Sequence, residues 1–183
     1  MGTLKEAEWD AFQTRLTPVS FKKGEDVFPA TEICNKVLFI THGVLASEYH
    51  FNNDLTITRF FKSKGHCSNI ISLFQQKVAH DRIFAITNVE GVIVPVDLWQ
   101  EHYLYSDGIG LYFRKKMIEI LLEDKEFMTI KTLSGVQGKL AFLQENYPEV
   151  ILETPWKYIA NFMGVTPAWL SRTLKKKEVR KKS

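Results

Sequence analysis

The sequence predicts an α+β protein, in which an antiparallel β-rich part is followed by a long helix and by two short helices near the C-terminus. Three observations predict this order. Short segments rich in Val, Ile, Phe and Thr fill residues 19–96. Apolar residues then recur at helical spacing from Ile109 to Met128. Two Thr-Pro pairs, which are typical of helix starts, follow later in the chain.

The β-rich part is predicted from apolar segments that turn residues separate. The clearest of these segments are Val37–Ile40, Val44–Phe51, Leu55–Phe61 and Val92–Val96. Asn52-Asn53-Asp54 lies between two of them and is typical of a hairpin turn. This spacing favours a small antiparallel barrel or a double-sheet roll. We also expect a helix over residues 1–16 and a short inserted helix over residues 70–74.

A helix of about five turns is predicted from Ile109 to about Met128, because no proline interrupts this stretch and apolar residues lie on two of its sides. In one interpretation the helix packs only on its own roll. In the other, one side packs on the roll and the other side on a second copy of the chain; the length and the two apolar sides favour this interpretation. Ser134-Gly135 interrupts the pattern, and another helix is expected from Gly138 to Tyr147.

We therefore expect three parts: a roll over residues 1–107, a linking and dimerisation helix over 108–133, and a helical domain over 134–183. The hydrophobic fraction of 45% is normal for a globular protein. No apolar run approaches the roughly 20 residues of a membrane helix. The first residues show no basic region followed by an apolar stretch, so we expect no secretory signal, no membrane contact and a cytoplasmic location.

The most informative stretch begins at Thr154. Thr154-Pro155 and Thr166-Pro167 each place a capping hydroxyl before a proline at the first helical position. Gly164 lies between them and can adopt the left-handed conformation that ends a helix. The stretch therefore predicts two short helices that a tight turn joins.

The interior of this stretch fits two crossing helices. Ala160 is small at the position where the helices would cross, and Leu170 supplies a buried aliphatic side chain to the second helix. The rest of the small core is expected to comprise Ile159, Met163, Val165 and Leu174. An ordinary helical hairpin is the alternative, but the two caps and the spacing of Ala160 and Gly164 favour a helix-turn-helix.

Positive charge gathers at the C-terminal end. The whole chain carries 24 Lys and Arg against 21 Asp and Glu, a net charge of +3. Residues 172–183 alone carry a net charge of +6, which leaves −3 for the remainder. A solvated basic tail is the alternative interpretation. A basic segment next to a helix-turn-helix is better interpreted as an electrostatic contact with nucleic-acid phosphates.

If this unit is a helix-turn-helix, its second helix enters the major groove of DNA. The residues expected to face the DNA are Thr166, Ala168, Trp169, Ser171, Arg172, Lys175 and Lys176. Arg172 is the best candidate to contact a base, because its guanidinium matches O6 and N7 of guanine. Ser171 and the lysines are expected to hold phosphates. Trp169 could instead belong to the core.

The order of these parts resembles the CRP/FNR family of transcription regulators. The resemblance covers nearly the whole chain and is strongest near the C-terminus. It rests on Lys22-Lys23-Gly24-Glu25, residues 33–40, residues 68–74, Tyr158-Ile159-Ala160, residues 164–167 and Leu170-Ser171-Arg172. It implies a double-stranded β-helix roll of the cyclic-nucleotide-binding type, a winged helix, and dimerisation through the long helix. The partners that it implies are double-stranded DNA, a second copy of the chain and RNA polymerase.

The sequence departs from the family pattern in the effector cassette, which we place at Ser68, Asn69, Ile70, Asp81 and Arg82. Cyclic-nucleotide-binding members have a Gly-Glu pair for the ribose where this chain has Asn69-Ile70. They have an Arg-Ser or Arg-Thr pair for the phosphate near Asp81-Arg82. Isoleucine cannot bind a ribose hydroxyl and an aspartate repels a phosphate, so we expect no cyclic AMP binding. Arg82 would restore binding if the alignment shifts by one residue.

A second departure concerns the wing. The sequence ends soon after the second helix, so we expect a short or missing wing.

Other chemistry is not indicated. Two cysteines are too few for a four-cysteine iron–sulfur cluster. The five histidines lack the H-x-H spacing that a cupin-type metal enzyme would have. No nucleophile elbow or glycine-rich phosphate loop is present. We therefore expect no enzyme activity, metal or cofactor. The alternatives are a cupin-like metal protein and a ligand-sensing roll that does not act on DNA.

Overall fold

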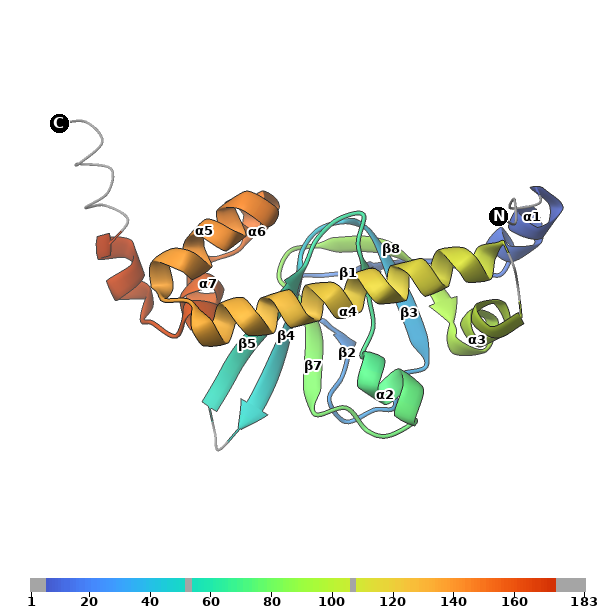
Figure 1. Ribbon diagram of the computed structural model, residues 1–183, viewed down its shortest axis with the longest axis horizontal. Helices are drawn as coiled ribbons and strands as arrows, with labels where there is room; N and C mark the ends of the chain where they lie inside the picture. The colour runs from blue at the N-terminus through green and yellow to red at the C-terminus, as the bar shows by residue number, and fades with distance from the viewer. Residues whose placement is uncertain (1–5, 52–53, 106–107, 174–183) are drawn as a thin grey trace.

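A computed structural model describes residues 6–51, 54–105 and 108–173. A β-roll occupies the middle of the molecule, and one long helix runs across it (Figure 1). The remaining C-terminal helices gather at one end of that helix, while the N-terminal helix lies near its other end (Figure 1).

Two antiparallel four-stranded sheets form the roll. The first contains, in order, β1 (Thr17–Phe21), β8 (Val89–Pro95), β3 (Lys36–His42) and β6 (His66–Cys67). The second contains β2 (Asp26–Phe28), β7 (Asp81–Ala85), β4 (Leu45–Phe51) and β5 (Asp54–Phe61). β5 is an edge strand of this second sheet, so one side of its backbone has no neighbouring strand in the part of the chain that the structure describes.

The roll turns from β3 into β4 at Gly43, where the backbone φ angle is +94°. A side chain at this position would begin 2.3 Å from the carbonyl oxygen of Asn88. Glycine is therefore required by both the backbone conformation and the close approach of the neighbouring turn.

Seven helices complete the named elements of the described chain. They are α1 (Glu6–Gln13), α2 (Ile70–Gln75), α3 (Val96–Tyr105), α4 (Ile109–Leu133), α5 (Val136–Asn146), α6 (Pro148–Glu153) and α7 (Trp156–Met163). Residues 167–173 form a further helical segment.

Most of the expected elements are confirmed. The four apolar segments lie in β3, β4, β5 and β8, and β4 pairs with β5 as a hairpin whose turn, 52–53, lies outside the described residues. The strands form two separate sheets, so of the two predicted arrangements the double-sheet roll is confirmed and the closed barrel is not. The short inserted helix is α2, and the long helix starts at Ile109 as expected.

Several boundaries were wrong. β8 ends at Pro95, and Val96, which was expected in a strand, begins α3 because the proline ends the strand pairing with β3. α5 begins at Val136 rather than Gly138. The N-terminal helix ends at Gln13. α3 and α6 were not predicted. α6 has only six residues, too few to show a helical period.

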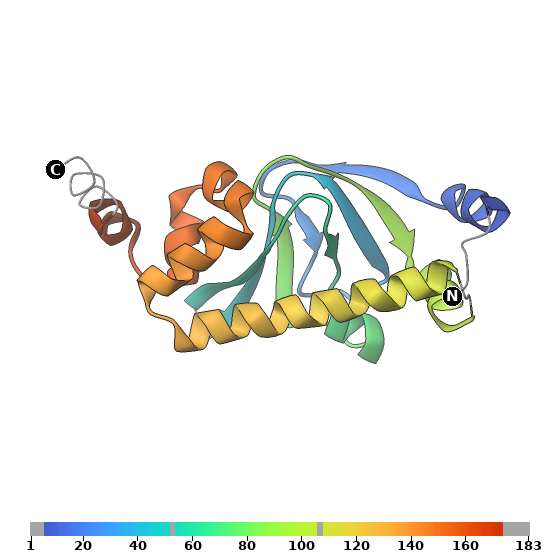
Figure 2. The same cartoon turned by 45° about the horizontal axis from the view of Figure 1, so that its top comes forward.

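The apolar side chains form two cores. The first fills the roll and includes Phe113 and Met117 from the first half of α4. The second joins three parts of the molecule: Phe60 and Phe84 from the second sheet, Phe127 from α4, and Phe162 from α7. The C-terminal helices therefore pack against the second sheet (Figure 2).

The long helix α4 has apolar side chains on a face that is buried against the rest of the chain and also on a face that is exposed. Ile109, Phe113, Met117, Ile120 and Phe127 are buried against the rest of the chain. Its exposed apolar side chains are Tyr112, Ile118, Leu121, Leu122, Met128 and Leu133. The predicted two apolar sides are therefore present, one covered and one uncovered.

None of the helices that the structure describes is long and apolar enough to cross a membrane.

Candidate nucleic-acid interface and candidate effector cavity

The turn after α7 has the geometry that the sequence predicts. Gly164 lies in the left-handed region, with φ 74° and ψ 35°. The N–H of Gly164 donates to Asn161 O at 3.0 Å, and the N–H of Val165 donates to Ala160 O at 3.0 Å. These bonds satisfy carbonyl groups at the end of the helix. The chain can therefore change direction within two residues.

The helix that follows is capped by Thr166. Its hydroxyl oxygen accepts from the N–H of Trp169 at 3.2 Å, and its carbonyl oxygen accepts from the N–H of Leu170 at 3.1 Å. A threonine at this position is a preferred N-cap because its oxygen satisfies an unpaired helix N–H. The predicted cap at Thr166 is confirmed.

The predicted cap at Thr154 was wrong. The N–H of Thr154 donates to Val150 O at 3.0 Å, so this residue ends α6 instead of starting α7. Pro155 has ψ 133° and occupies the cap position of α7 without a side-chain hydrogen bond. Thr154 is the C-terminal cap of α6, a helix that was not predicted.

The two short helices meet through small and aliphatic side chains. Ile159, Ala160, Met163 and Leu170 are buried, and Val165 is partly buried. Leu174 lies outside the described residues. A larger side chain than Ala160 would push the helices apart, because no exposed surface remains there. The described residues 156–173 thus form a helix-turn-helix.

The outer face of the second helix is open. Thr166, Ala168, Ser171 and Arg172 are exposed, and Trp169 is 40% exposed. Trp169 therefore lies at the surface and outside the small core. The Arg172 Nε donates to Ala168 O at 3.3 Å, within the same helix. Lys175 and Lys176 lie outside the described residues.

The first helix of this unit is docked on the edge strand β5. The side chain of Asn161 accepts from the N–H of Ile57 at 2.7 Å and donates to Leu55 O at 2.7 Å. Lys131 of α4 donates from Nζ to Ile57 O. These side chains bond to the strand edge as a neighbouring strand would. The helix-turn-helix is consequently fixed to the roll by polar bonds as well as by the shared core.

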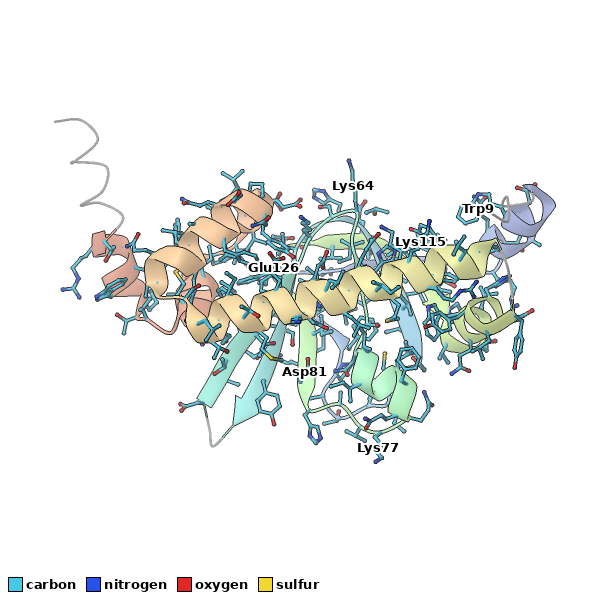
Figure 3. The ribbon with its side chains drawn as sticks, viewed as in Figure 1. Trp9, Lys64, Lys77, Asp81, Lys115 and Glu126 are labelled. Atoms are coloured by element: carbon cyan, nitrogen blue, oxygen red, sulfur yellow. The ribbon has the colours of Figure 1, made fainter. Side chains whose placement is uncertain are left out.

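On the inner side of the same sheet lies a cavity of about 520 Å³. The second sheet, α2 and the second half of α4 enclose it, and Asp81 marks its position beside the long helix (Figure 3). Four of the five predicted cassette residues line it: Ser68, Asn69, Ile70 and Asp81. Residues that the sequence analysis assigned to one effector cassette therefore lie together at one cavity.

Asp81 belongs to a closed hydrogen-bond network. Its Oδ1 accepts from the Asn69 side chain at 2.7 Å, and its Oδ2 accepts from the Ser47 hydroxyl at 2.6 Å. Thr58 donates to the Ser47 oxygen at 2.9 Å. The Asn69 side chain also caps α2 by accepting from the N–H of Ser72 at 3.2 Å. Asn69 and Asp81 thus hold each other in place.

The structure places Arg82 away from this cavity, whose lining does not include it. Its guanidinium bonds to Glu48 at 2.7 Å and to Asp26 at 3.0 Å. Asp81 and Arg82 are neighbours in a strand, so their side chains point to opposite faces of the sheet. A shift of the alignment by one residue therefore does not bring Arg82 to a ligand in the cavity.

The cation that does line the cavity is Arg59, which the sequence analysis missed. It is 5% exposed, its Nη1 bonds to Asp124 and its Nη2 bonds to Glu123 at 2.9 Å. A charged residue between Thr58 and Phe60 in an apolar strand was the available signal, because arginine is buried only when paired. Its partners lie about sixty residues later, where no local pattern points to them.

A second cation at the cavity is Lys131, from the last turns of α4. Burial, together with the smaller effect of the positive charge of Lys139, lowers its pKa to about 8. Within the described part of the chain, no three His, Cys, Asp or Glu side chains lie close enough together to hold a metal ion.

Sequence comparison gives no relative for this chain. No protein-family model matches it, and no curated protein matches it.

Solved structures do match. FixK2 from Bradyrhizobium japonicum is 16% identical, with a TM-score of 0.72 over 90% of this chain and 85% of that one. A protein from Eubacterium rectale, described as of the CRP/FNR family, is 16% identical, with a TM-score of 0.69 over 97% and 85%. The c-di-GMP-responsive regulator CLP from Xanthomonas campestris is 14% identical, with a TM-score of 0.69 over 96% and 93%. The chain therefore has the fold of the CRP/FNR regulators.

Proposed function

We propose that this protein is a sequence-specific DNA-binding transcription regulator of the CRP/FNR type. The observation that carries the proposal is the helix-turn-helix, in which Gly164 turns the chain and Thr166 caps a second helix whose first turns are exposed. A helix presented in this way can enter the major groove with its N-terminal residues at the base edges. The proposed DNA contacts are Thr166, Ala168, Trp169, Ser171, Arg172, Lys175 and Lys176.

We propose that the protein acts as a homodimer through α4. Its uncovered face carries Ile118, Leu121 and Leu122, which are 57%, 52% and 62% exposed. Apolar side chains that recur on one face of a long helix are suited to a matching helix across a two-fold axis. Such symmetry would separate the two recognition helices by about 34 Å, one turn of DNA.

The proposed organisation follows the chain. Residues 1–107 sense an effector, 108–133 link and dimerise, and 134–183 bind DNA. The net charge of +6 over residues 172–183 supports phosphate contacts beside the recognition helix. The remaining proposals are RNA polymerase as a further partner, a cytoplasmic location, and no catalytic activity.

The test is selection of bound fragments from a random DNA library with the full chain. We expect an enriched motif with two related half-sites and an affinity that falls steeply as salt increases. Titration of the motif and of its scrambled form should separate specific from general binding. Selection without an enriched motif, or binding that salt does not weaken, would contradict the proposal. Light scattering that reports a monomer at micromolar concentration would contradict the dimer alone.

A further inference from the structure

Two buried polar side chains in the cavity keep an atom without a hydrogen-bond partner. Among the described residues, neither Arg59 Nε nor Ser68 Oγ has a partner, although these residues are only 5% and 6% exposed. Both residues line the same cavity of about 520 Å³. A buried polar group without a partner is costly, so two of them around one space indicate a missing binding partner.

From these atoms we propose that the cavity binds an uncharged, mostly apolar small molecule with a polar head that accepts a hydrogen bond from Arg59 Nε and bonds to the Ser68 hydroxyl. An amide or ketone oxygen has this chemistry. The inference rests on the proposed function, since it names the class of effector that such a regulator would sense. Such a ligand differs from a cyclic nucleotide because it carries no phosphate. Arg82, the arginine of β7 that was the candidate phosphate contact, does not line the cavity.

The head group is uncharged because the charge of Arg59 is already matched. Its guanidinium bonds to both Glu123 and Asp124, and Asp81 adds a third carboxylate to the same cavity region. The second cation there, Lys131, already bonds to Ile57 O, so three carboxylates stand against two cations. An anionic head at Arg59 would therefore meet more negative than positive charge. A cationic head cannot accept the hydrogen bond that Arg59 Nε offers.

The rest of the ligand is apolar because most of the remaining wall is. Phe61, Ile70, Ile71, Val78, Phe127 and Met128 line the cavity between its polar residues. A volume of about 520 Å³ falls within the range of about 300–1,000 Å³ that is typical of small-molecule sites. Met128 is 70% exposed and Ile71 is 68% exposed, so ligand burial would also cover side chains that now face solvent.

The experiment uses the full chain and four probes: decanamide, decanoate and decylammonium, each with ten carbon atoms in a linear chain, and cyclic AMP. Calorimetry at neutral pH compares their affinities, and the Nε–H resonance of Arg59 in a ¹⁵N–¹H spectrum reports contact at the proposed atom. We expect decanamide to bind and to shift this resonance. Decanoate and decylammonium should bind about tenfold more weakly. Cyclic AMP should show no binding at micromolar concentration.

Two variants test the atoms. Arg59→Lys keeps the positive charge beside Glu123 and Asp124 but removes the Nε–H, and Ser68→Ala removes only the hydroxyl. Each should weaken decanamide about threefold to tenfold, as the loss of one hydrogen bond does. Ser20→Ala, on exposed strand β1, is the matched control and should bind as the unmodified chain does.

Three results would overturn the proposal: no decanamide binding, decanoate or cyclic AMP binding more tightly than decanamide, or an unmoved Arg59 resonance. The first would mean that water satisfies both atoms. None of these measurements includes DNA, so the ligand class and the DNA-binding function can fail separately. Loss of DNA binding with decanamide binding intact would leave this inference standing.

Discussion

The helix-turn-helix and the cavity differ in how their polar groups are held. The turn is fixed by bonds between residues that are close in the chain, such as Val165 to Ala160 and Trp169 to Thr166. The cavity is fixed by bonds across the fold, such as Arg59 of β5 to Asp124 of α4. A unit built from near neighbours keeps its shape wherever it is placed. A site built from distant elements changes when those elements move.

Strand β5 joins the two regions. Arg59 and Thr58 line the cavity, whereas Ile57 and Phe60 belong to the second core, which includes the helix-turn-helix. Asn161 bonds to the backbone of the same strand. A single strand therefore separates the cavity from the first helix of the helix-turn-helix. The cavity, which is held by bonds between distant elements, is therefore in direct contact with the helix-turn-helix, which is held by local bonds.

Removing the aromatic side chain that joins the regions should have the largest effect. Phe162 of α7 is fully buried, and its ring lies 5.5 Å from that of Phe60 and 5.8 Å from that of Phe127. Phe162→Ala should lower the free energy of unfolding by about 3–5 kcal/mol, measured by chemical denaturation. The control Phe74→Ala, at a half-exposed side chain, should cost about 1 kcal/mol or less. A similar small loss for Phe162 would show that the two regions do not share a core.

Asn161→Ala should have a smaller effect, because it removes only the hydrogen bonds between α7 and β5. It leaves the N–H of Ile57 and the carbonyl oxygen of Leu55 without their partners, which should cost about 1–3 kcal/mol. The amide of Ile57 should also exchange with solvent faster in a hydrogen-exchange experiment. Asn146→Ala is the matched control, because among the described residues the Asn146 side chain bonds within its own helix, to Phe142 O. Unchanged exchange at Ile57 would contradict the docking role of Asn161.

The same contrast explains what the sequence could predict. The left-handed Gly164, the cap at Thr166 and the buried Ala160 follow from residue type and short spacing, and all three are confirmed. The strands and the long helix also follow from local periodicity. Thr154 failed because the six-residue helix before it was too short to be recognised.

The cavity was only half predictable. Asn69, Ile70 and Asp81 were located through the family resemblance, and they do line it. Arg59 depends on carboxylates about sixty residues away, and the docking of Asn161 depends on an edge strand about a hundred residues earlier. Such pairs are set by the packing of whole elements, for which a single sequence carries no short-range signal. The side of the sheet that Arg82 faces depends on strand register, which a shift of one residue reverses.

Arg172→Ala should test the proposed DNA contact of the helix-turn-helix alone. Arg172 is exposed on the face that also carries Ala168 and Trp169. Losing a base contact should cost about 1–3 kcal/mol on the selected motif and relax the preference at one base pair in each half-site. Binding titrations on the motif and on scrambled DNA would measure this.

Lys176→Ala should instead weaken binding to both DNAs alike and reduce the salt dependence by about one unit. The matched control is Lys157→Ala, which removes a positive charge from an exposed position in α7. Equal losses on both DNAs for Arg172→Ala would show that Arg172 contacts only phosphates.

The smallest effect should come from the charge of Lys131, which lines the cavity and bonds to β5. Burial lowers its pKa to about 8, whereas an unfolded lysine keeps its proton up to about pH 10.4. Between these values the unfolded chain binds more protons than the folded chain, so this group makes the free energy of unfolding rise with pH. Because the side chain is partly solvated, the rise should stay below about 1 kcal/mol per pH unit. Denaturation at pH 7.5, 8.5 and 9.5 should show this rise in the unmodified chain relative to Lys131→Met, which keeps the apolar stem and lacks the charge. Parallel pH profiles for the two proteins would show that the Lys131 ammonium has the same proton affinity in the folded and unfolded chain.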